Sequence, residues 1–139
     1  MSQENVELAR KGYEAIARRD FDAVLDLMHP DIEAHNPPEV PDAGIHRGHE
    51  EVRRDWEQTW DLFEDFSIEV ERYIDAGDEL VVFLRYRARA RGSNTPIEAQ
   101  MAHVWTVRDG KAVVFRQYLD RAAALEAAGL SDQDAHAHS

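Results

Sequence analysis

Apolar residues in the first half of the chain recur at the spacing of amphipathic helices. One stripe over residues 3–18 and a shorter one over residues 21–28 predict two helices, the second ending before Pro30. A third stripe predicts a helix over residues 49–63 and contains two tryptophans, Trp56 and Trp60. These tryptophans lie one helical turn apart, so we expect both to belong to the core or to the wall of a pocket.

From residue 66 onward, apolar and polar residues alternate with the period of β-strands. The pattern predicts strands over residues 66–70, 80–91, 97–107 and 112–119. A shorter strand over residues 32–35 precedes a loop over residues 36–48 that is rich in proline and glycine. A last helix over residues 121–128 is expected to end at Gly129, and a disordered tail over residues 131–139 follows.

This order of elements predicts an α+β fold. Helices that precede a run of antiparallel strands pack together on one face of the sheet. A long sheet twists, and curling around the three N-terminal helices turns it into a cone-shaped α+β barrel with a conical cavity. We therefore expect one domain over residues 1–130.

The composition narrows the possible functions. The chain has 139 residues and no cysteine, which excludes disulfides and thiolate chemistry. It shows neither a signal peptide nor an apolar run of the roughly 20 residues that a membrane helix needs, so we expect a cytoplasmic protein without membrane contact. The net charge of −12 disfavours nucleic acid. We find no phosphate-binding loop and no other cofactor motif, and we predict no cofactor.

Four arginines alternate along the predicted strand over residues 80–91. Burying Leu84, Tyr86 and their alternate neighbours would place Arg85, Arg87, Arg89 and Arg91 outside, facing solvent or a partner subunit. The opposite orientation would place Arg87 in the cavity, where it would bind an anionic ligand. We favour the outside position.

Three segments resemble a known family. They are KGYEAIARRDFDAVLDLMHPDIEAH near the N-terminus, HRGHEEV at the third helix, and AHVWTVRDGKAVVFRQYLDRAAAL at the final hairpin. Their order and spacing resemble the SnoaL-like family of the nuclear transport factor 2-like superfamily, which contains polyketide cyclases, ketosteroid isomerases and non-catalytic binding proteins. The resemblance implies the cone-shaped barrel, a small-molecule ligand and a homodimer formed through the outer face of the sheet.

The resemblance also suggests catalytic residues. Tyr13 matches the helix-one tyrosine of ketosteroid isomerases, but their base and oxyanion aspartates fall on Asn36 and Ala102, which disfavours that mechanism. His35 is a possible substitute base, although it and Asn36 point to opposite sides of the strand. In limonene-epoxide hydrolases the final-strand aspartate matches Asp120, but their middle-strand carboxylate is missing here.

SnoaL-like cyclases use one aspartate at the position of Asp120 as general acid/base. Tyr118 and Arg116 lie on the same side of the predicted strand, so the resemblance implies that both contact the ligand. A single carboxylate can work in this way if an apolar pocket raises its pKa. Asp120 also precedes a helix, where an aspartate is an ordinary N-cap. Both interpretations remain open.

The register of the final hairpin decides which side chains line the cavity. If Gly110 is the left-handed residue of a bulged turn, Gln100, Ala102 and Val104 share the face of Arg116 and point into the cavity. A two-residue Asp-Gly turn would reverse this and bring His103 to the same face. We favour the bulged turn, because it agrees with the family position of Ala102.

A metal site is not expected. His35, His46 and His49 lie in one region, but zinc sites need three or four regularly spaced ligands. The sequence thus predicts a domain that binds a small apolar molecule. It leaves open whether the domain is a cyclase- or isomerase-type enzyme, with Asp120, Tyr13 and His35 as catalytic candidates, or a non-catalytic binding or dimerisation domain.

Overall fold

The computed structural model describes residues 2–40 and 43–131. Three helices, α1 (Ser2–Ala17), α2 (Phe21–Leu25) and α3 (Gly48–Leu62), belong to the first half of the chain, and α4 (Arg121–Ala127) follows the last strand. The strands are β1 (Met28–Asn36), β2 (Gly44–Arg47), β3 (Phe63–Ala76), β4 (Glu79–Ala90), β5 (Pro96–Arg108) and β6 (Lys111–Tyr118). No helix in the described part of the chain is long and apolar enough to span a membrane.

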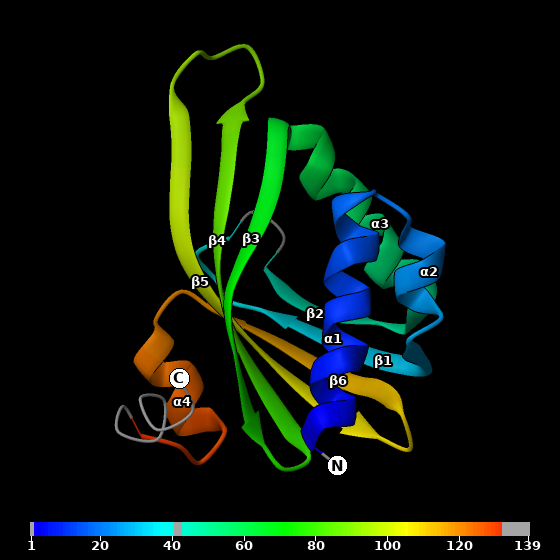
Figure 1. Ribbon diagram of the computed structural model, residues 1–139. Coiled ribbons are helices and arrows are strands. Elements are labelled where there is room, and N and C mark those ends of the chain that lie inside the picture. Colours follow the sequence, from blue (N-terminus) through cyan, green and yellow to red (C-terminus); the bar gives the residue numbers. More distant parts are fainter. Residues whose placement is uncertain (1, 41–42, 132–139) are drawn as a thin grey trace.

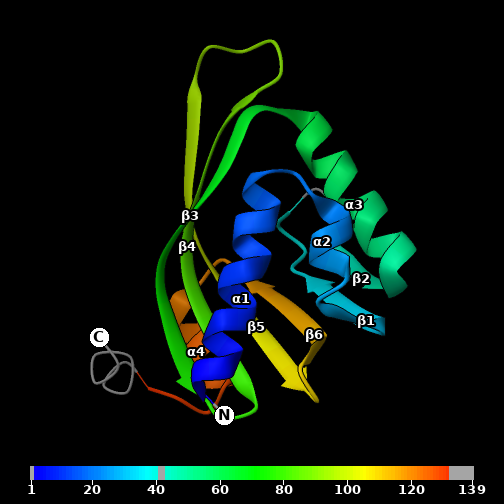
Figure 2. The ribbon, with the colours of Figure 1, turned by 45° about the vertical axis from the view of Figure 1, so that its right-hand side comes forward.

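All six strands form one sheet in the order β2-β1-β6-β5-β4-β3. Neighbours pair antiparallel except β1 and β6, which run parallel. The sheet curves around α1, α2 and α3 but does not close on itself (Figures 1 and 2). The predicted α+β fold, with a strongly curved sheet wrapped around N-terminal helices, is confirmed.

The first two strands differ from the prediction because their stability comes from distant partners, and β3 is also longer than the predicted strand over residues 66–70. The first strand begins at Met28, where the chain meets the final hairpin, and the amide of Ala112 donates to the carbonyl of Leu27 at 3.0 Å. β2 lies inside the predicted loop and pairs with the end of β1, His35 opposite Ile45. A four-residue edge strand has no periodicity that could distinguish it from a loop.

The concave face of the sheet packs on the helices. Alternate residues of β4, such as Leu80, Val82 and Leu84, are fully buried there against Ile16 of α1 and Val52 of α3. The apolar stripes of the predicted helices thus face the sheet, as their spacing requires.

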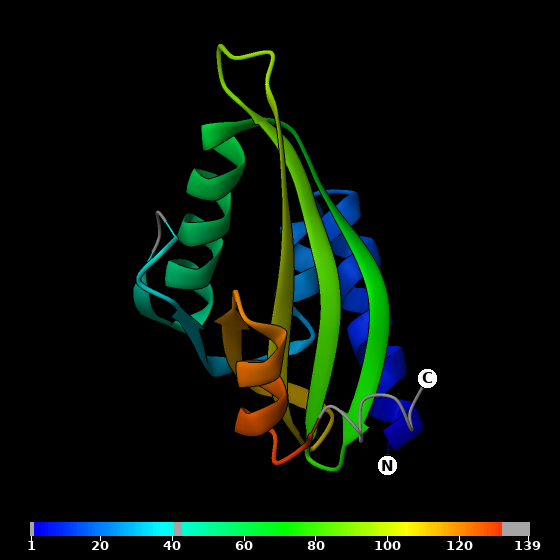
Figure 3. The same cartoon turned by 90° about the vertical axis from the view of Figure 1, so that its left-hand side faces the viewer.

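The convex face carries α4 over its lower half (Figure 3). Ala124 and Leu125 of this helix pack on Val81 of β4 and on Ala102 and Val104 of β5. The middle of the sheet is therefore covered on both faces. Because both faces of β5 are covered, its residues do not alternate between buried and exposed positions, and this affects how the site can be predicted.

The predicted arginine row lies on the convex face beyond α4. Arg85 pairs with Glu71 at 3.4 Å and also with Glu98, and Arg89 pairs with Asp65. Arg87 lies 3.6 Å from Glu98. Acidic residues of β3 and β5 thus pair with three of the arginines, Arg91 donates to the carbonyl oxygen of Asp61, and none of the four lines the cavity described below.

Candidate functional site

The concave face of the sheet, together with α1 and α3, encloses a cavity of about 320 Å³. This volume is within the range of small-molecule sites. Aromatic side chains form much of the wall, among them Trp56, Trp60, Phe63, Phe66, Trp105 and Phe115. Most of the polar groups belong to two clusters, one on the sheet and one where α3 faces the end of β1, and the exposed Glu39 adds a further carboxyl group.

Helix α3 presents one face to this cavity. Asp55 and Thr59 are one turn apart, and Trp56 and Trp60 follow at the same spacing. Phe66 fixes the ring of Trp60 from β3, with ring centroids 4.5 Å apart. The aromatic wall therefore forms where the apolar stripe of a helix meets an inward-facing strand residue.

The first polar cluster is a hydrogen-bonded chain across β4, β5, β6 and α1. The indole Nε1 of Trp105 donates to the hydroxyl of Tyr13 at 2.9 Å, and this hydroxyl lies 2.6 Å from Nδ1 of His103. On the other side of the imidazole, Nε2 lies 2.8 Å from the hydroxyl of Tyr86, which donates to Oε1 of Gln117 at 2.6 Å.

The two ends of this chain determine the direction of every hydrogen bond. An indole N–H can only donate, and an amide oxygen can only accept. The hydroxyl of Tyr13 therefore donates to Nδ1 of His103, and Nε2–H of His103 donates to Tyr86. This direction holds for a neutral His103, whose pKa burial lowers to about 3, and its proton is then on Nε2, which also lies 3.3 Å from Oε1 of Gln117.

Burial keeps the side chains of this hydrogen-bonded chain uncharged. Desolvation lowers the pKa of His103 to about 3, although the hydrogen bond with Gln117 acts in the opposite direction. Burial also raises the pKa of Tyr13 well above its ordinary value, against the effect of the Trp105 hydrogen bond. At neutral pH the cluster presents hydrogen-bonding groups to the cavity and no charge.

The second polar cluster centres on a buried carboxylate. Asp55 is only 4% exposed, and the side-chain amide of Asn36 donates to its Oδ2 at 3.1 Å. His46 of β2 approaches from the other side, with Nε2 3.9 Å from Oδ1 of Asp55. The side chain of Asp55 thus lies on the wall of the cavity.

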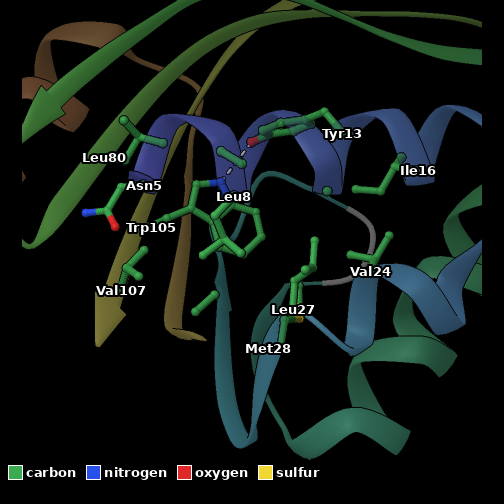
Figure 4. Close-up of a pocket in the computed structure, with 13 residues that line it drawn as sticks. Asn5, Leu8, Tyr13, Ile16, Val24, Leu27, Met28, Leu80, Trp105 and Val107 are labelled. Carbon is green, nitrogen blue, oxygen red and sulfur yellow. Dashed lines mark hydrogen bonds between the residues drawn. The ribbon is translucent and has the colours of Figure 1, made fainter. Parts of the chain in front are cut away.

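A separate, smaller hollow of about 30 Å³ lies on the other side of Tyr13 and Trp105. Figure 4 shows these two side chains meeting between α1 and the sheet, with Leu27 and Met28 on the far side of the hollow. Its wall is mostly aliphatic, and its volume is that of about one water molecule. We regard it as a packing defect and not as a binding site.

Four of the residues singled out from the sequence line the large cavity: Tyr13, Asn36, Trp56 and Trp60. His35 does not line it; its Nε2 lies 3.1 Å from Oε1 of Glu33 instead. The alternation of β1 thus turns Asn36 inward and His35 away, as the strand geometry requires.

The predicted facing of the final hairpin is wrong. Gln100, Ala102 and Val104 of β5, with Arg116 and Tyr118 of β6, do not line the cavity. Ala102 pairs with Tyr118 and Val104 with Arg116, the expected register, but this face is the convex one. His103 and Trp105 face the cavity opposite Gln117 and Phe115.

The turn itself combines both alternatives that the sequence left open. Asp109 and Gly110 have positive φ angles of 52° and 76° and form a two-residue turn between Arg108 and Lys111. An irregularity between Thr106 and Val107 then shifts the register by one residue, because Val107 pairs with Ala112 while Thr106 pairs with Val114.

Asp120 lies at the N-cap of α4. Its carboxylate accepts from the amide of Ala122 at 2.9 Å, and the side chain is exposed outside the cavity. The capping interpretation is therefore confirmed. The general acid/base role stays a prediction, for which this position offers no support.

The three clustered histidines make separate contacts. Nε2 of His49 lies 3.1 Å from the carbonyl oxygen of Met28, while His35 lies near Glu33 and His46 near Asp55. Among residues 2–40 and 43–131, no group of three or more side chains is placed to hold a metal ion.

Comparison with known proteins identifies the family. The family model of the SnoaL-like domain matches residues 9–115. A search of curated proteins found no significant match. Among solved structures, 351 chains match significantly, so the fold is widespread and does not by itself indicate a reaction.

Three of these structures illustrate the range. A nuclear transport factor 2-like protein from Burkholderia thailandensis is 28% identical, with a TM-score of 0.76 over 81% of this chain and 87% of its own. TerC, co-crystallised with polyporic acid, is 26% identical, with a TM-score of 0.77 over 91% of this chain and 98% of its own. A putative SnoaL-like polyketide cyclase from a Jannaschia species is 18% identical, with a TM-score of 0.75 over 84% and 85%, and shows the fold alone.

Proposed function

The chain belongs to the SnoaL-like domain family, and we propose that it binds a small, largely apolar organic molecule in the cavity between the concave sheet face, α1 and α3. The observation that supports this most strongly is the cavity itself, about 320 Å³ in volume with an aromatic wall. A space of this size lined mostly by apolar side chains favours occupation by an apolar ligand. The co-crystallisation of TerC with polyporic acid gives a precedent in a relative.

The tryptophans provide a direct assay. The chain has three, and all of them, Trp56, Trp60 and Trp105, line the cavity. A neutral fluorescent probe, N-phenyl-1-naphthylamine, should therefore quench the tryptophan emission by energy transfer and saturate at one molecule per chain.

A cavity-filling variant gives the control. Ala99 lines the cavity, so Ala99→Phe should occupy part of its volume and weaken probe binding at least about tenfold, the equivalent of about 1.4 kcal/mol. The same substitution at the exposed Ala122, Ala122→Phe, should leave binding unchanged. Absence of saturable binding, or equal binding by both variants, would show that the cavity is not the site.

An acid/base enzyme is the second candidate, because the cavity wall contains the buried carboxylate of Asp55. In this role it would replace Asp120, which lies outside the cavity. A mass-spectrometric screen of small enone and β-diketone compounds would test this, with conversion expected from the native chain and lost in Asp55→Asn. The homodimer formed through the outer sheet face and the cytoplasmic location stay predictions.

A further inference from the structure

Gln117 of β6 is the residue at which the hydrogen-bonded chain across the sheet ends. Its Oε1 accepts from the hydroxyl of Tyr86 at 2.6 Å and lies 3.3 Å from Nε2 of His103. These two contacts hold the oxygen of the side-chain amide, because the amide nitrogen is a donor and cannot accept from either group. The nitrogen of this amide, Nε2 of Gln117, therefore takes no part in the chain.

Nε2 of Gln117 has no hydrogen-bond partner among the residues that the structure describes. Both hydrogen bonds of the side chain use Oε1. Nε2 is also not one of the buried side-chain atoms that lack a partner, so it reaches accessible space. Because Gln117 is half-buried and lines the large cavity, its two N–H groups can donate to a molecule that occupies the cavity.

The donors on either side of Gln117 already have acceptors within the protein. On the sheet, the indole N–H of Trp105 donates to the hydroxyl of Tyr13 at 2.9 Å. On the side of β1, the side-chain amide of Asn36 donates to Oδ2 of Asp55 at 3.1 Å. A ligand that enters the cavity therefore meets the amide of Gln117 as a donor that none of these groups occupies.

The chain also makes the amide of Gln117 a stronger donor. Tyr86 and His103 both act on its oxygen. Hydrogen bonds in series polarise one another, most of all where the dielectric constant is low. Since resonance couples the oxygen and the nitrogen of an amide, hydrogen bonds accepted by the oxygen draw electron density from the nitrogen and leave its N–H groups more positive.

Apolar side chains flank Gln117 on the cavity wall. Phe115 precedes it by two residues and Leu119 follows it by two, and all three line the cavity. A ligand that covers the amide displaces water from its N–H groups, which costs free energy unless the ligand accepts a hydrogen bond in return. This part of the wall thus fits an apolar molecule with one acceptor atom.

We propose that Gln117 recognises the ligand of this cavity, a largely apolar molecule whose carbonyl oxygen accepts from the amide N–H groups of Gln117. A carbonyl oxygen only accepts, so it adds no donor that the apolar side chains beside it would leave without a partner. This assignment rests on the proposed function, because it specifies how the ligand of the same cavity is bound.

Two neutral probes of matched shape test the role of the carbonyl. The ketone 2-acetylnaphthalene and the alkene 2-isopropenylnaphthalene have the same rings, but only the ketone has an acceptor oxygen. Each is titrated into the isotope-labelled native chain, and NMR follows the side-chain amide protons of Gln117. These protons should move downfield with the ketone relative to the alkene, because both probes exert the same ring-current effect. The amide of Gln58, which is exposed and outside the cavity, should not move.

One substitution removes the donor and keeps the acceptor. Gln117→Glu retains an oxygen for Tyr86 and His103 but replaces the N–H groups by a second oxygen, which accepts only when the carboxyl group is ionised. Displacement of N-phenyl-1-naphthylamine measures the affinities. The affinity for the ketone should fall at least about tenfold, and that for the alkene should change by less than about twofold. Gln58→Glu is the matched control and should change neither affinity.

The outcomes separate this inference from the proposed function. If N-phenyl-1-naphthylamine does not bind the native chain, the proposed function fails. If it binds but the amide protons of Gln117 respond equally to the two probes, or to neither, only the carbonyl assignment is wrong. An equal loss of affinity for the ketone in Gln117→Glu and Gln58→Glu would overturn the role of Gln117. The NMR comparison on the native chain decides the assignment even if Gln117→Glu does not fold.

Discussion

Protonation of His103 should destabilise the fold in mild acid. In the unfolded chain a histidine has a pKa of roughly 6.5, whereas burial in the folded protein lowers the pKa of His103 to about 3. Between these values the unfolded state binds one more proton than the folded state at this site. The free energy of unfolding therefore rises with pH across this window and is fully regained above about pH 6.5.

The magnitude follows from the width of the window. Each pH unit below about 6.5 removes about 1.4 kcal/mol, so lowering the pH from 7 to 5 should cost about 2 kcal/mol through His103 alone. Since pH 5 lies well above the folded-state pKa of about 3, His103 remains neutral in the folded protein throughout this measurement.

Urea denaturation at pH 7 and pH 5 measures this loss. His103→Gln removes the titrating group, so the difference in free energy of unfolding between the two pH values should shrink by about 2 kcal/mol relative to the native chain. His29→Gln is the matched control, because His29 is exposed, and it should leave the difference unchanged. A direct measurement is the carbon chemical shift of the His103 ring, which should not titrate above pH 4. Titration of this ring near pH 6 would refute both the neutral state and the direction of the hydrogen-bonded chain.

Three further substitutions test the neighbouring structure. Tyr13→Phe leaves the buried Trp105 N–H and His103 Nδ1 without their hydrogen-bond partner and should lower the free energy of unfolding in urea by about 2–4 kcal/mol. Tyr73→Phe should lower it by less than about 0.5 kcal/mol. Equal losses in the two variants would contradict the hydrogen-bonded chain through Tyr13. Asp120→Ala should cost about 1 kcal/mol in the same assay and leave probe binding intact, since Asp120 is a cap outside the cavity; weakened binding would restore it as a site residue. Gly110→Ala should cost about 1–2 kcal/mol in thermal unfolding because its φ is 76°, and an unchanged melting temperature would contradict the turn geometry.

The helices and their part of the site were predictable because each helix is amphipathic. The stripe of α1 contains Tyr13 and that of α3 contains Trp56 and Trp60, and all three line the cavity. Helical periodicity identifies the buried face directly, and the cavity lies on that face.

The strand residues were not predictable in the same way, since β5 is covered on both sides. Every residue from 101 to 107 is buried, those of one face by α1 and the cavity and those of the other by α4. Alternation of apolar and polar residues indicates the inward face only where the other face is exposed. In the centre of β5 this pattern does not distinguish the two faces, so the orientation of His103 has to be inferred from another part of the sequence.

The hairpin between β4 and β5 does contain that information. Arg89 pairs with Pro96, and the same register continues to Tyr86 opposite Ala99 and Val82 opposite His103. If this register is extended past the strand ends at Ala90 and Pro96, its centre falls between Gly92 and Ser93. Placing the arginine row outside and reading Gly92–Ser93 as the turn would therefore have turned His103 inward together with Tyr86.

Asp55 was missed for a different reason, because charged residues in a helix are ordinarily assigned to its exposed face. Yet Asp55 follows Val52 by three residues, which places it at the edge of the apolar stripe. A carboxylate at such a position loses hydration on folding, a cost that its hydrogen bond with Asn36 helps to offset. His103 likewise introduces a polar ring at a buried position in the middle of the sheet. Both side chains break the local pattern at the wall of the same cavity, and such breaks are expected where a fold sacrifices stability to bind a ligand.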